Sequence, residues 1–194
     1  SAAIAADNAS PWSPSVLLRD RALMWFTLSG LLASFVGGSF ASCISQYVLV
    51  VADSDFAEKV VAVVLPVNAA VVVALQYAVG RRLNARNIRP LMTFGTLCFV
   101  IGLGGFIVSG SSLLLWGVSA AIFTLGEVIY APGEYMLIDN IAPAGMKASY
   151  FSAQSLGWLG AAFNPMISGA ILTHMPHWSL FVVLMVAIIA AWLM

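Results

Sequence analysis

The sequence predicts an all-α membrane protein with six transmembrane helices. Of its 194 residues, 61% are hydrophobic and only 8% are charged, and the mean hydropathy is +0.98. A soluble domain would carry roughly 25% charged residues, so the lipid bilayer is the expected solvent for most of this chain. The hydrophobic residues also gather into six segments, each close to the ~20 residues that cross a ~30 Å hydrocarbon core.

The six segments follow one another with short connections. We expect the helices at residues 23–51, 58–79, 90–109, 113–136, 148–173 and 180–194. Residues 1–20 lack the basic stretch followed by an apolar stretch that marks a signal peptide, so we interpret them as a cytoplasmic linker ahead of a helical bundle at residues 21–194. The sixth segment is short and the chain begins with Ser, so we expect a fragment of a longer protein whose last helix is truncated.

Basic residues predict the orientation of the bundle. Only Lys59 lies in the connection that also holds Asp53, Asp55 and Glu58. The other basic residues fall on the opposite side of the predicted membrane, and they are Arg19, Arg21, Arg81, Arg82, Arg86, Arg89 and Lys147. Because cytoplasmic loops retain Lys and Arg, we expect the N-terminus of this chain to be cytoplasmic.

Polar side chains are unevenly distributed among the segments. The third and sixth carry very few, whereas in the other four they recur at helical spacing and so share one face of each helix. These residues are Ser39, Ser42, Ser45 and Gln46 in the first segment, Asn68 and Gln76 in the second, Thr124, Glu127, Tyr130 and Glu134 in the fourth, and Gln154, Ser155, Trp158 and Asn164 in the fifth. We therefore expect four helices to line a polar site and two to lie outside, as an internal three-plus-three repeat would produce.

The connection after the second segment carries a recognisable motif. Residues 80–89 read GRRLNARNIR and resemble G-x-x-x-D-R-x-G-R-R, the cytoplasmic signature of the major facilitator superfamily (MFS) of transporters. Gly80 and Arg89 match the signature. Asn84 stands where the family has Asp, and Asn87 where it has Gly, so the gating salt bridge of the signature lacks its usual acid here.

A second motif lies in the fifth segment. Residues 160–169 read GAAFNPMISG and resemble the antiporter signature of the same family, G-x-x-x-G-P-x-x-G-G. Gly160, Pro165 and Gly169 match, while Asn164 and Ser168 replace glycines. With both motifs on the expected helices, nearly the whole chain resembles the C-terminal six-helix half of an MFS transporter.

The resemblance implies a three-plus-three helix bundle that forms one half of a transporter. The implied partners are the lipid bilayer, the N-terminal six-helix half or a second copy of this chain, a small-molecule substrate, and protons. Longer stretches such as YAPGEYMLIDNIAP also resemble enterobacterial exporters of this family, which implies proton-driven efflux of small solutes (dipeptides, sugars such as arabinose, or drugs) across the inner membrane. No cofactor, metal or nucleic acid is implied.

Glu127 is the residue on which the transport hypothesis depends. A charge at membrane depth costs several kcal/mol unless it is paired or faces a polar cavity, so it indicates a functional site. We expect Glu127 to bind a coupling proton or a cationic group of the substrate; the alternative is a neutral glutamic acid that serves helix packing. The candidate substrate contacts, each of which could instead be an interhelical hydrogen bond, are Ser39, Ser42, Gln46, Asn68, Gln76, Tyr130 and Trp158.

Two further carboxyl groups lie toward the cytoplasmic end of the fourth segment. We expect Glu134 and Asp139 to form a gating latch with arginines of the preceding cytoplasmic loop, and the alternative is that they are solvated loop charges. An exposed salt bridge contributes only about 0–1 kcal/mol, which biases an equilibrium without driving it. The gating candidates are Gly80, Arg81, Arg82, Asn84, Arg86, Arg89, Glu134 and Asp139.

Glycines of the fifth segment predict close helix packing. Gly157, Gly160 and Gly169 permit a small-xxx-small approach, because packing drives helix association in lipid. A sharper hypothesis is that this helix slides or bends against its partner, with Pro165 as the kink.

The remaining reactive residues do not indicate catalysis or metal binding. We interpret His174 and His177 as solvated loop residues, and Cys43 and Cys98 as packing residues without metal partners. An intramembrane protease would need a nucleophilic Ser in a G-x-S-G setting and a His at membrane depth, but residues 37–40, GGSF, lack the closing Gly. A non-transporting scaffold or receptor built on a transporter half remains an alternative.

Overall fold

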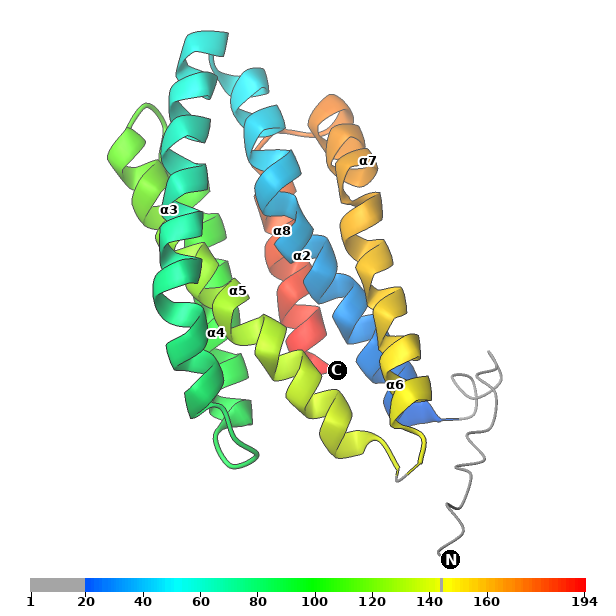
Figure 1. Ribbon diagram of the computed structural model, residues 1–194. Helices are drawn as coiled ribbons and strands as arrows, with labels where there is room; N and C mark the ends of the chain where they lie inside the picture. The colour runs from blue at the N-terminus through cyan, green and yellow to red at the C-terminus, as the bar shows by residue number, and fades with distance from the viewer. Residues whose placement is uncertain (1–19, 144) are drawn as a thin grey trace, which may run out of the picture.

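The chain folds into a bundle of helices (Figure 1). The structure is a computed structural model and describes residues 20–143 and 145–194, so residues 1–19 of the predicted linker, with Arg19, lie outside it. The elements are α2 (Arg21–Val51), α3 (Ser54–Arg82), α4 (Ile88–Val108), α5 (Leu113–Ile141), α6 (Lys147–Gln154), the 3₁₀ turn η1 (Ser155–Trp158), α7 (Leu159–His174) and α8 (Ser179–Leu193). No strand occurs in the described residues.

The predicted segments match these helices to within a few residues at each end. The fifth segment, Lys147–His174, is a single span built from α6, η1 and α7. In the described part of the chain, five helices are long and apolar enough to cross a membrane, and α8 is a shorter apolar helix of 15 residues. The predicted fold class, an all-α membrane bundle, is confirmed.

Short polar side chains fix where several helices begin. Oδ1 of Asp20 accepts from the backbone N–H groups of Ala22 and Leu23 at the start of α2. Asp53 accepts from the N–H of Phe56 at the start of α3, at 2.7 Å. Because the first N–H groups of a helix have no partner within it, these caps stabilise the helix starts on either side of the bilayer.

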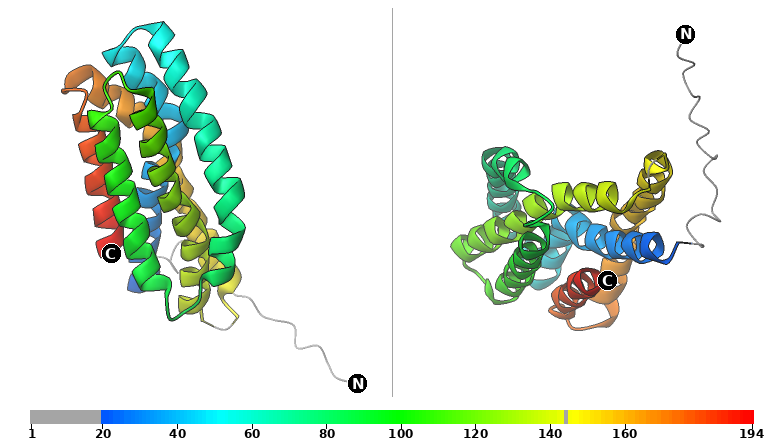
Figure 2. Two further views of the ribbon diagram at one scale, coloured as in Figure 1. Left: turned by 90° about the vertical axis from the view of Figure 1, so that its left-hand side faces the viewer. Right: turned by 90° about the horizontal axis from the view of Figure 1, so that it is seen from below.

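The helices form two groups that lie side by side, one of α3, α4 and α5 and the other of α2, α6, α7 and α8 (Figure 2). Within the groups, α5 packs against α4 and α3, and α2 packs against α7 and α8. Contacts of α4 with α8 and of α2 with α3 join the groups. The helices that we predicted to be peripheral, α4 and α8, therefore help to hold the bundle together, and their outward faces are apolar (Phe94, Leu97, Ile101, Val182, Val186 and Ile189).

An aromatic cluster fills the core where α4, α5 and α8 meet. The ring centroids of Phe99 and Phe123 are 4.8 Å apart, and those of Phe106 and Trp116 are 5.4 Å apart. Phe181 of α8 lies 5.6 Å from Phe106, centroid to centroid. All five side chains are buried, so this cluster fixes the packing of three helices.

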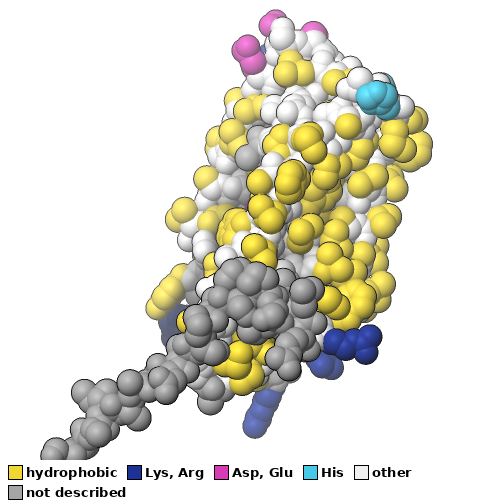
Figure 3. All heavy atoms as spheres, turned by 90° about the vertical axis from the view of Figure 1, so that its right-hand side faces the viewer, with side chains coloured by type: hydrophobic (Ala, Val, Ile, Leu, Met, Phe, Trp, Pro, Cys, Tyr) yellow, Lys and Arg dark blue, Asp and Glu magenta, His cyan; other side chains and the backbone are white. Residues whose placement is uncertain are grey.

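Most basic side chains of the described residues lie at one end of the bundle, and an acidic cluster lies at the other (Figure 3). Arg21, Arg81, Arg86 and Lys147 lie at or beside helix ends on the side where α2 begins. The acidic residues 53, 55 and 58 belong to the opposite end, at the connection of α2 to α3. An apolar belt between two polar ends is the surface that a membrane-spanning bundle needs.

The backbones of α2 and α7 approach closely at small residues. A Cβ atom added to Gly160 would lie 1.9 Å from the carbonyl oxygen of Leu31 and 2.8 Å from the backbone nitrogen of Phe35. A Cβ added to Gly38 would lie 2.7 Å from the Cβ of Ala161. Only glycine fits these positions at the observed helix separation, which is the packing that membrane helices favour.

A buried polar cluster at the same interface is centred on Asn164 of α7. Its Nδ2 donates to the backbone carbonyl of Phe35 in α2 at 2.7 Å, and its Oδ1 accepts from Ser42 at 3.0 Å and from the thiol of Cys43 at 2.7 Å. Cys43 also bonds to Ser168, one turn further along α7, at 2.9 Å. Asn164, where the antiporter signature has Gly, thus ties α7 to α2 with hydrogen bonds.

We expect Gly160→Ala to destabilise the bundle by about 1–3 kcal/mol, because the added methyl group meets backbone atoms that must shift. The matched control is Gly169→Ala, on the same helix, where no atom lies within 4 Å of an added Cβ. That control should be neutral or slightly stabilising. Thermal unfolding of both variants in detergent, followed by circular dichroism, measures the difference; equal melting temperatures would contradict the close approach.

The start of α2 is also tied to α6, near the predicted cytoplasmic surface. The hydroxyl of Tyr150 in α6 donates a hydrogen bond to Oδ2 of Asp20. This bond, assisted by the backbone N–H groups of Leu23 and Ala22, holds the pKa of the Asp20 carboxyl below its usual value against a smaller opposing effect of burial. The contact therefore depends on the ionised form of Asp20.

A folded-state pKa that lies below the unfolded one gives stability that is present above the unfolded pKa and lost as the pH falls through the folded value. We therefore expect Tyr150→Phe to lower the melting temperature slightly at neutral pH, with a difference from the unmodified protein that shrinks below about pH 4. Melting curves in detergent between pH 3 and 8 measure this. A difference that does not change with pH would contradict the role of Asp20.

Candidate functional site

Glu127 is the central residue of α5 and lies between α2 and α3. Its Oε2 accepts a hydrogen bond from Nδ2 of Asn68 in α3 at 2.7 Å, and the same nitrogen donates to Oγ1 of Thr124 at 2.9 Å. On the α2 side, a Cβ added to Gly37 would lie 4.0 Å from Oε1. The carboxyl group is thus held by an amide from a neighbouring helix, and it forms no ion pair within the described residues.

Glu127 lines a cavity of about 380 Å³ that we call the central groove. Its walls come from α2, α4, α5, α6, η1 and α7, and its lining residues are Ala33, Ser34, Gly37, Gly38, Phe99, Glu127, Tyr130, Ala131, Glu134, Tyr135, Gln154, Trp158 and Ala161. Tyr135 and Trp158 are 50% and 61% exposed, so they present aromatic surface beside the two carboxyl groups. A cavity of a few hundred Å³ with apolar walls and a few polar groups has the character of a small-molecule site.

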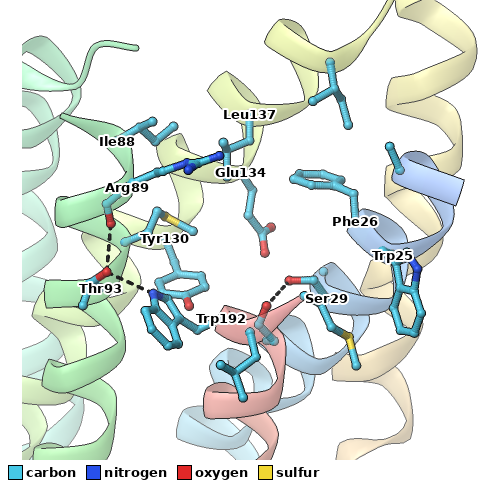
Figure 4. A pocket seen from close by; sticks show the side chains of 17 residues that line it. Trp25, Phe26, Ser29, Ile88, Arg89, Thr93, Tyr130, Glu134, Leu137 and Trp192 are labelled. Carbon is cyan, nitrogen blue, oxygen red and sulfur yellow. Dashed lines mark hydrogen bonds between the residues drawn. The ribbon is translucent and has the colours of Figure 1, made fainter. Parts of the chain in front are cut away.

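Glu134 lies about two helical turns beyond Glu127 on the same face of α5. Nε2 of Gln154 lies 3.5 Å from its Oε2, which is long for a hydrogen bond. Glu134 and Tyr130 also line a second cavity of about 600 Å³, the basic-end cavity, together with Trp25, Phe26, Ser29, Arg89, Met92, Thr93 and Trp192 among others. Figure 4 shows the Glu134 carboxyl group pointing into this cavity, with Phe26 and Ser29 on one side and Tyr130 on the other.

Three of the seven candidate substrate contacts lie at or beside Glu127. Tyr130 and Trp158 line the central groove, and Asn68 bonds to the Glu127 carboxyl group. The hydroxyl of Tyr130 is paired with Oγ1 of Thr96 at 2.7 Å, so the phenol is held against α4.

The other four candidates lie outside the central groove. Ser39 donates to the carbonyl of Val36 in its own helix at 2.5 Å, and Ser42 bonds to Asn164 at the α2–α7 interface. Gln46 is half-buried and Gln76 is exposed. These residues do recur at helical spacing, but the close packing of α7 against α2 covers Ser42.

The expected latch between Glu134 or Asp139 and the arginines Arg81, Arg82 or Arg86 is not formed in the described residues. Asp139 pairs instead with Lys147 across the α5–α6 connection, at 2.5 Å, and both side chains are half-exposed. Glu134 faces the interior, as described above. The guanidinium of Arg81 lies 5.5 Å from the ring centroid of Tyr77.

The basic loop is folded by its two asparagines. Oδ1 of Asn84 accepts from the N–H of Arg86 at 3.0 Å and from that of Asn87 at 3.1 Å. Nδ2 of Asn87 donates to the carbonyl of Arg82 at 2.7 Å. The two departures from the MFS signature thus form local turn contacts. Gly80 has open space around it, and Arg89, in the first turn of α4, lines the basic-end cavity.

The positions of the remaining predicted residues differ from one another. Gly157 and Gly160 lie against α2, whereas Gly169 has open space around it and Pro165 is exposed. His174 and His177 are exposed at the acidic end, and the described residues contain no group of His, Cys, Asp or Glu that could hold a metal ion.

Sequence reasoning missed the partners of Asn164. We predicted Cys43 to be a packing residue, and it is fully buried, but its thiol also donates to Asn164 and Ser168. The replacement of two signature glycines by Asn164 and Ser168 was the available signal, because a polar residue buried in a membrane helix needs a partner on a neighbour.

We expect Asn68→Leu to destabilise the protein by about 1–3 kcal/mol, because Glu127 and Thr124 lose their amide donor. The double variant Asn68→Leu with Glu127→Leu should recover part of this loss, since replacing both partners by apolar groups can be nearly neutral. Gln76→Leu, an exposed site on the same helix, is the control. Unfolding in detergent and denaturant measures these proteins together with the single variant Glu127→Leu, which completes the double-mutant cycle; additive losses in the double variant would contradict the contact.

Comparison with known proteins gives two relatives. The chain is 75% identical over 191 residues, 98% of its length, to the MFS-type transporter YdeE of Escherichia coli (strain K12), of which it covers 48%. It is 28% identical over 142 residues, 71% of its length, to the MFS-type transporter YqjV of Bacillus subtilis (strain 168), of which it covers 33%.

No family model and no solved structure matches the chain. The chain spans about half the length, or less, of the curated relatives it matches. Nearly all of it aligns with YdeE at high identity, and its helices are those of a multi-pass membrane protein. The resemblance stated from the two motifs is thereby confirmed: nearly the whole chain is similar to about half of an MFS-type transporter.

Proposed function

We propose that this chain is the C-terminal half of an inner-membrane exporter that uses the proton gradient to expel small solutes, such as dipeptides, sugars such as arabinose, or drugs. Alternating access requires two bundles that rock about a site between them. The missing bundle would be the N-terminal six-helix half or a second copy of this chain. The coverage of about half of YdeE supports this division.

The position of Glu127 carries the proposal. A carboxyl group at the middle of a membrane helix is costly, and such groups mark ion pathways and proton relays. Here it lines a groove large enough for a small solute and is held by Asn68 without a cationic partner in the described residues. In our proposal Glu127 binds the coupling proton, and release of that proton accompanies movement of the solute.

The cytoplasmic end serves as the gate in this proposal. The basic loop after α3 and the carboxyl group of Asp139 lie at the same end of the bundle. The bond of Asp139 to Lys147 supports the idea that ion pairs there are exchanged as the halves rock. An exposed pair contributes about 0–1 kcal/mol, so such an exchange biases the conformations without trapping one of them.

We expect Glu127→Gln to abolish proton-linked flux while sparing exchange. The Gln side chain keeps an oxygen for the Asn68 amide but cannot release a proton. In proteoliposomes that contain both halves under an imposed pH gradient, flux driven by the gradient should fall by roughly tenfold or more, a change of about 1.4 kcal/mol or more. Exchange of labelled for unlabelled solute, which needs no net proton movement, should persist.

The control is Glu58→Gln, which removes an exposed carboxyl group at the acidic end. It should leave both activities unchanged. Normal gradient-driven flux in Glu127→Gln would remove Glu127 from the coupling mechanism. If the two halves together move no solute of a panel that includes a dipeptide, a pentose and a cationic drug, the transport proposal fails and a scaffold or receptor becomes the better explanation.

A further inference from the structure

Among the described residues, the central groove is lined by acidic side chains and by no basic ones. Its lining holds two carboxyl groups, Glu127 and Glu134, and no Lys, Arg or His. The described basic residues lie toward the ends of the bundle. Lys147, at the start of α6, is paired with Asp139. Arg89 lines the basic-end cavity with Glu134 but forms no ion pair with it in the described structure. The groove therefore favours positive over negative charge.

The two carboxyl groups differ in the hydrogen bonds that they accept. Glu127 accepts a short bond of 2.7 Å from an amide that belongs to another helix. The contact of Glu134 with Gln154, at 3.5 Å, is too long to satisfy a carboxylate. A carboxylate accepts about four hydrogen bonds, so Glu134 has acceptor sites left for a ligand.

Glu134 lines both cavities, and its surroundings on the side of the central groove suit an ammonium group. Trp158 and Tyr135 line the same groove and are more than half or half exposed, and aromatic faces attract cations. Gln154 offers a side-chain oxygen that could accept a second N–H. A volume of about 380 Å³ accommodates a small solute with one such group.

We propose that Glu134 is the residue that recognises an ammonium group of the transported solute, so that the groove selects small amines over neutral or anionic solutes of the same size. Glu127 is then left for the coupling proton. This assignment rests on the proposed transport function and divides its two tasks between two carboxyl groups on one face of α5. It replaces the latch that the sequence suggested for Glu134.

The test uses one solute in three forms and the complete two-half transporter. The forms are a dipeptide, its N-acetyl derivative, which lacks the ammonium group, and its C-terminal amide, which keeps the ammonium group and lacks the carboxylate. Binding is measured by calorimetry and flux by proteoliposomes under a pH gradient. We expect the unmodified transporter to bind the N-acetyl form roughly tenfold or more weakly than the free dipeptide and to keep its affinity for the amide.

Glu134→Gln should remove the discrimination between the free and N-acetyl forms, and Glu134→Asp should restore part of it. Glu58→Gln is the matched control for loss of a carboxyl group elsewhere. Equal affinity for the free and N-acetyl forms in the unmodified protein, or unchanged discrimination in Glu134→Gln, would overturn the assignment. The first of these outcomes involves no substitution, so it is independent of any folding defect.

The two proposals fail in different ways. Binding that depends on the ammonium group and on Glu134, with no gradient-driven flux for any form, would support Glu134 and reject transport. Gradient-driven flux that is equal for all three forms would support transport and reject Glu134.

Discussion

The contact between α2 and α7 is the interaction on which the rest of this bundle depends. Gly160 allows the two backbones to meet, and Asn164 then bonds to Phe35, Ser42 and Cys43 across the interface. Because α2 also packs against α8, α3 and α6, fixing α7 to α2 fixes one complete wall of the central groove. The opposite wall is α5, which the aromatic core holds against α4. These two packings set the separation of Glu127, on α5, from the wall formed by α2 and α7.

The need for hydrogen bonds inside lipid explains where the polar side chains of the helices point. A polar group without water or a partner costs free energy, so polar residues in membrane helices pair across interfaces or face a cavity. Thr96 with Tyr130, and Ser29 with the carbonyl of Ala191, follow the first course. Glu134 follows the second. Among the described residues Thr27 is the exception, since its buried hydroxyl has no partner.

The sequence was sufficient for the helices and insufficient for the side-chain directions. Apolar runs and caps such as Asp53 define helix ends because they depend on local chemistry. Periodicity also selected Glu127, Tyr130 and Trp158, which share the groove. It could not show that Ser42 faces α7, because a stripe on one helix does not say which neighbour covers it. Likewise, the place of Glu134 toward the cytoplasmic end of its helix suggested an ion pair with the basic loop, whereas its position on the groove face of α5 turns it inward.

The 3₁₀ turn η1 gives the fifth span a property that a continuous α-helix lacks. A 3₁₀-helix rises ~2.0 Å and turns ~120° per residue, against ~1.5 Å and ~100° for an α-helix. Converting the four residues of η1 to α-helix would therefore shorten the span by about 2 Å and rotate α7 about its axis by about 80° relative to α6. Asn164 anchors α7 to α2, and Tyr150 anchors α6 to Asp20. The turn η1, which contains Trp158, lies between these two anchors, so it is the place where the span can change its length and rotation.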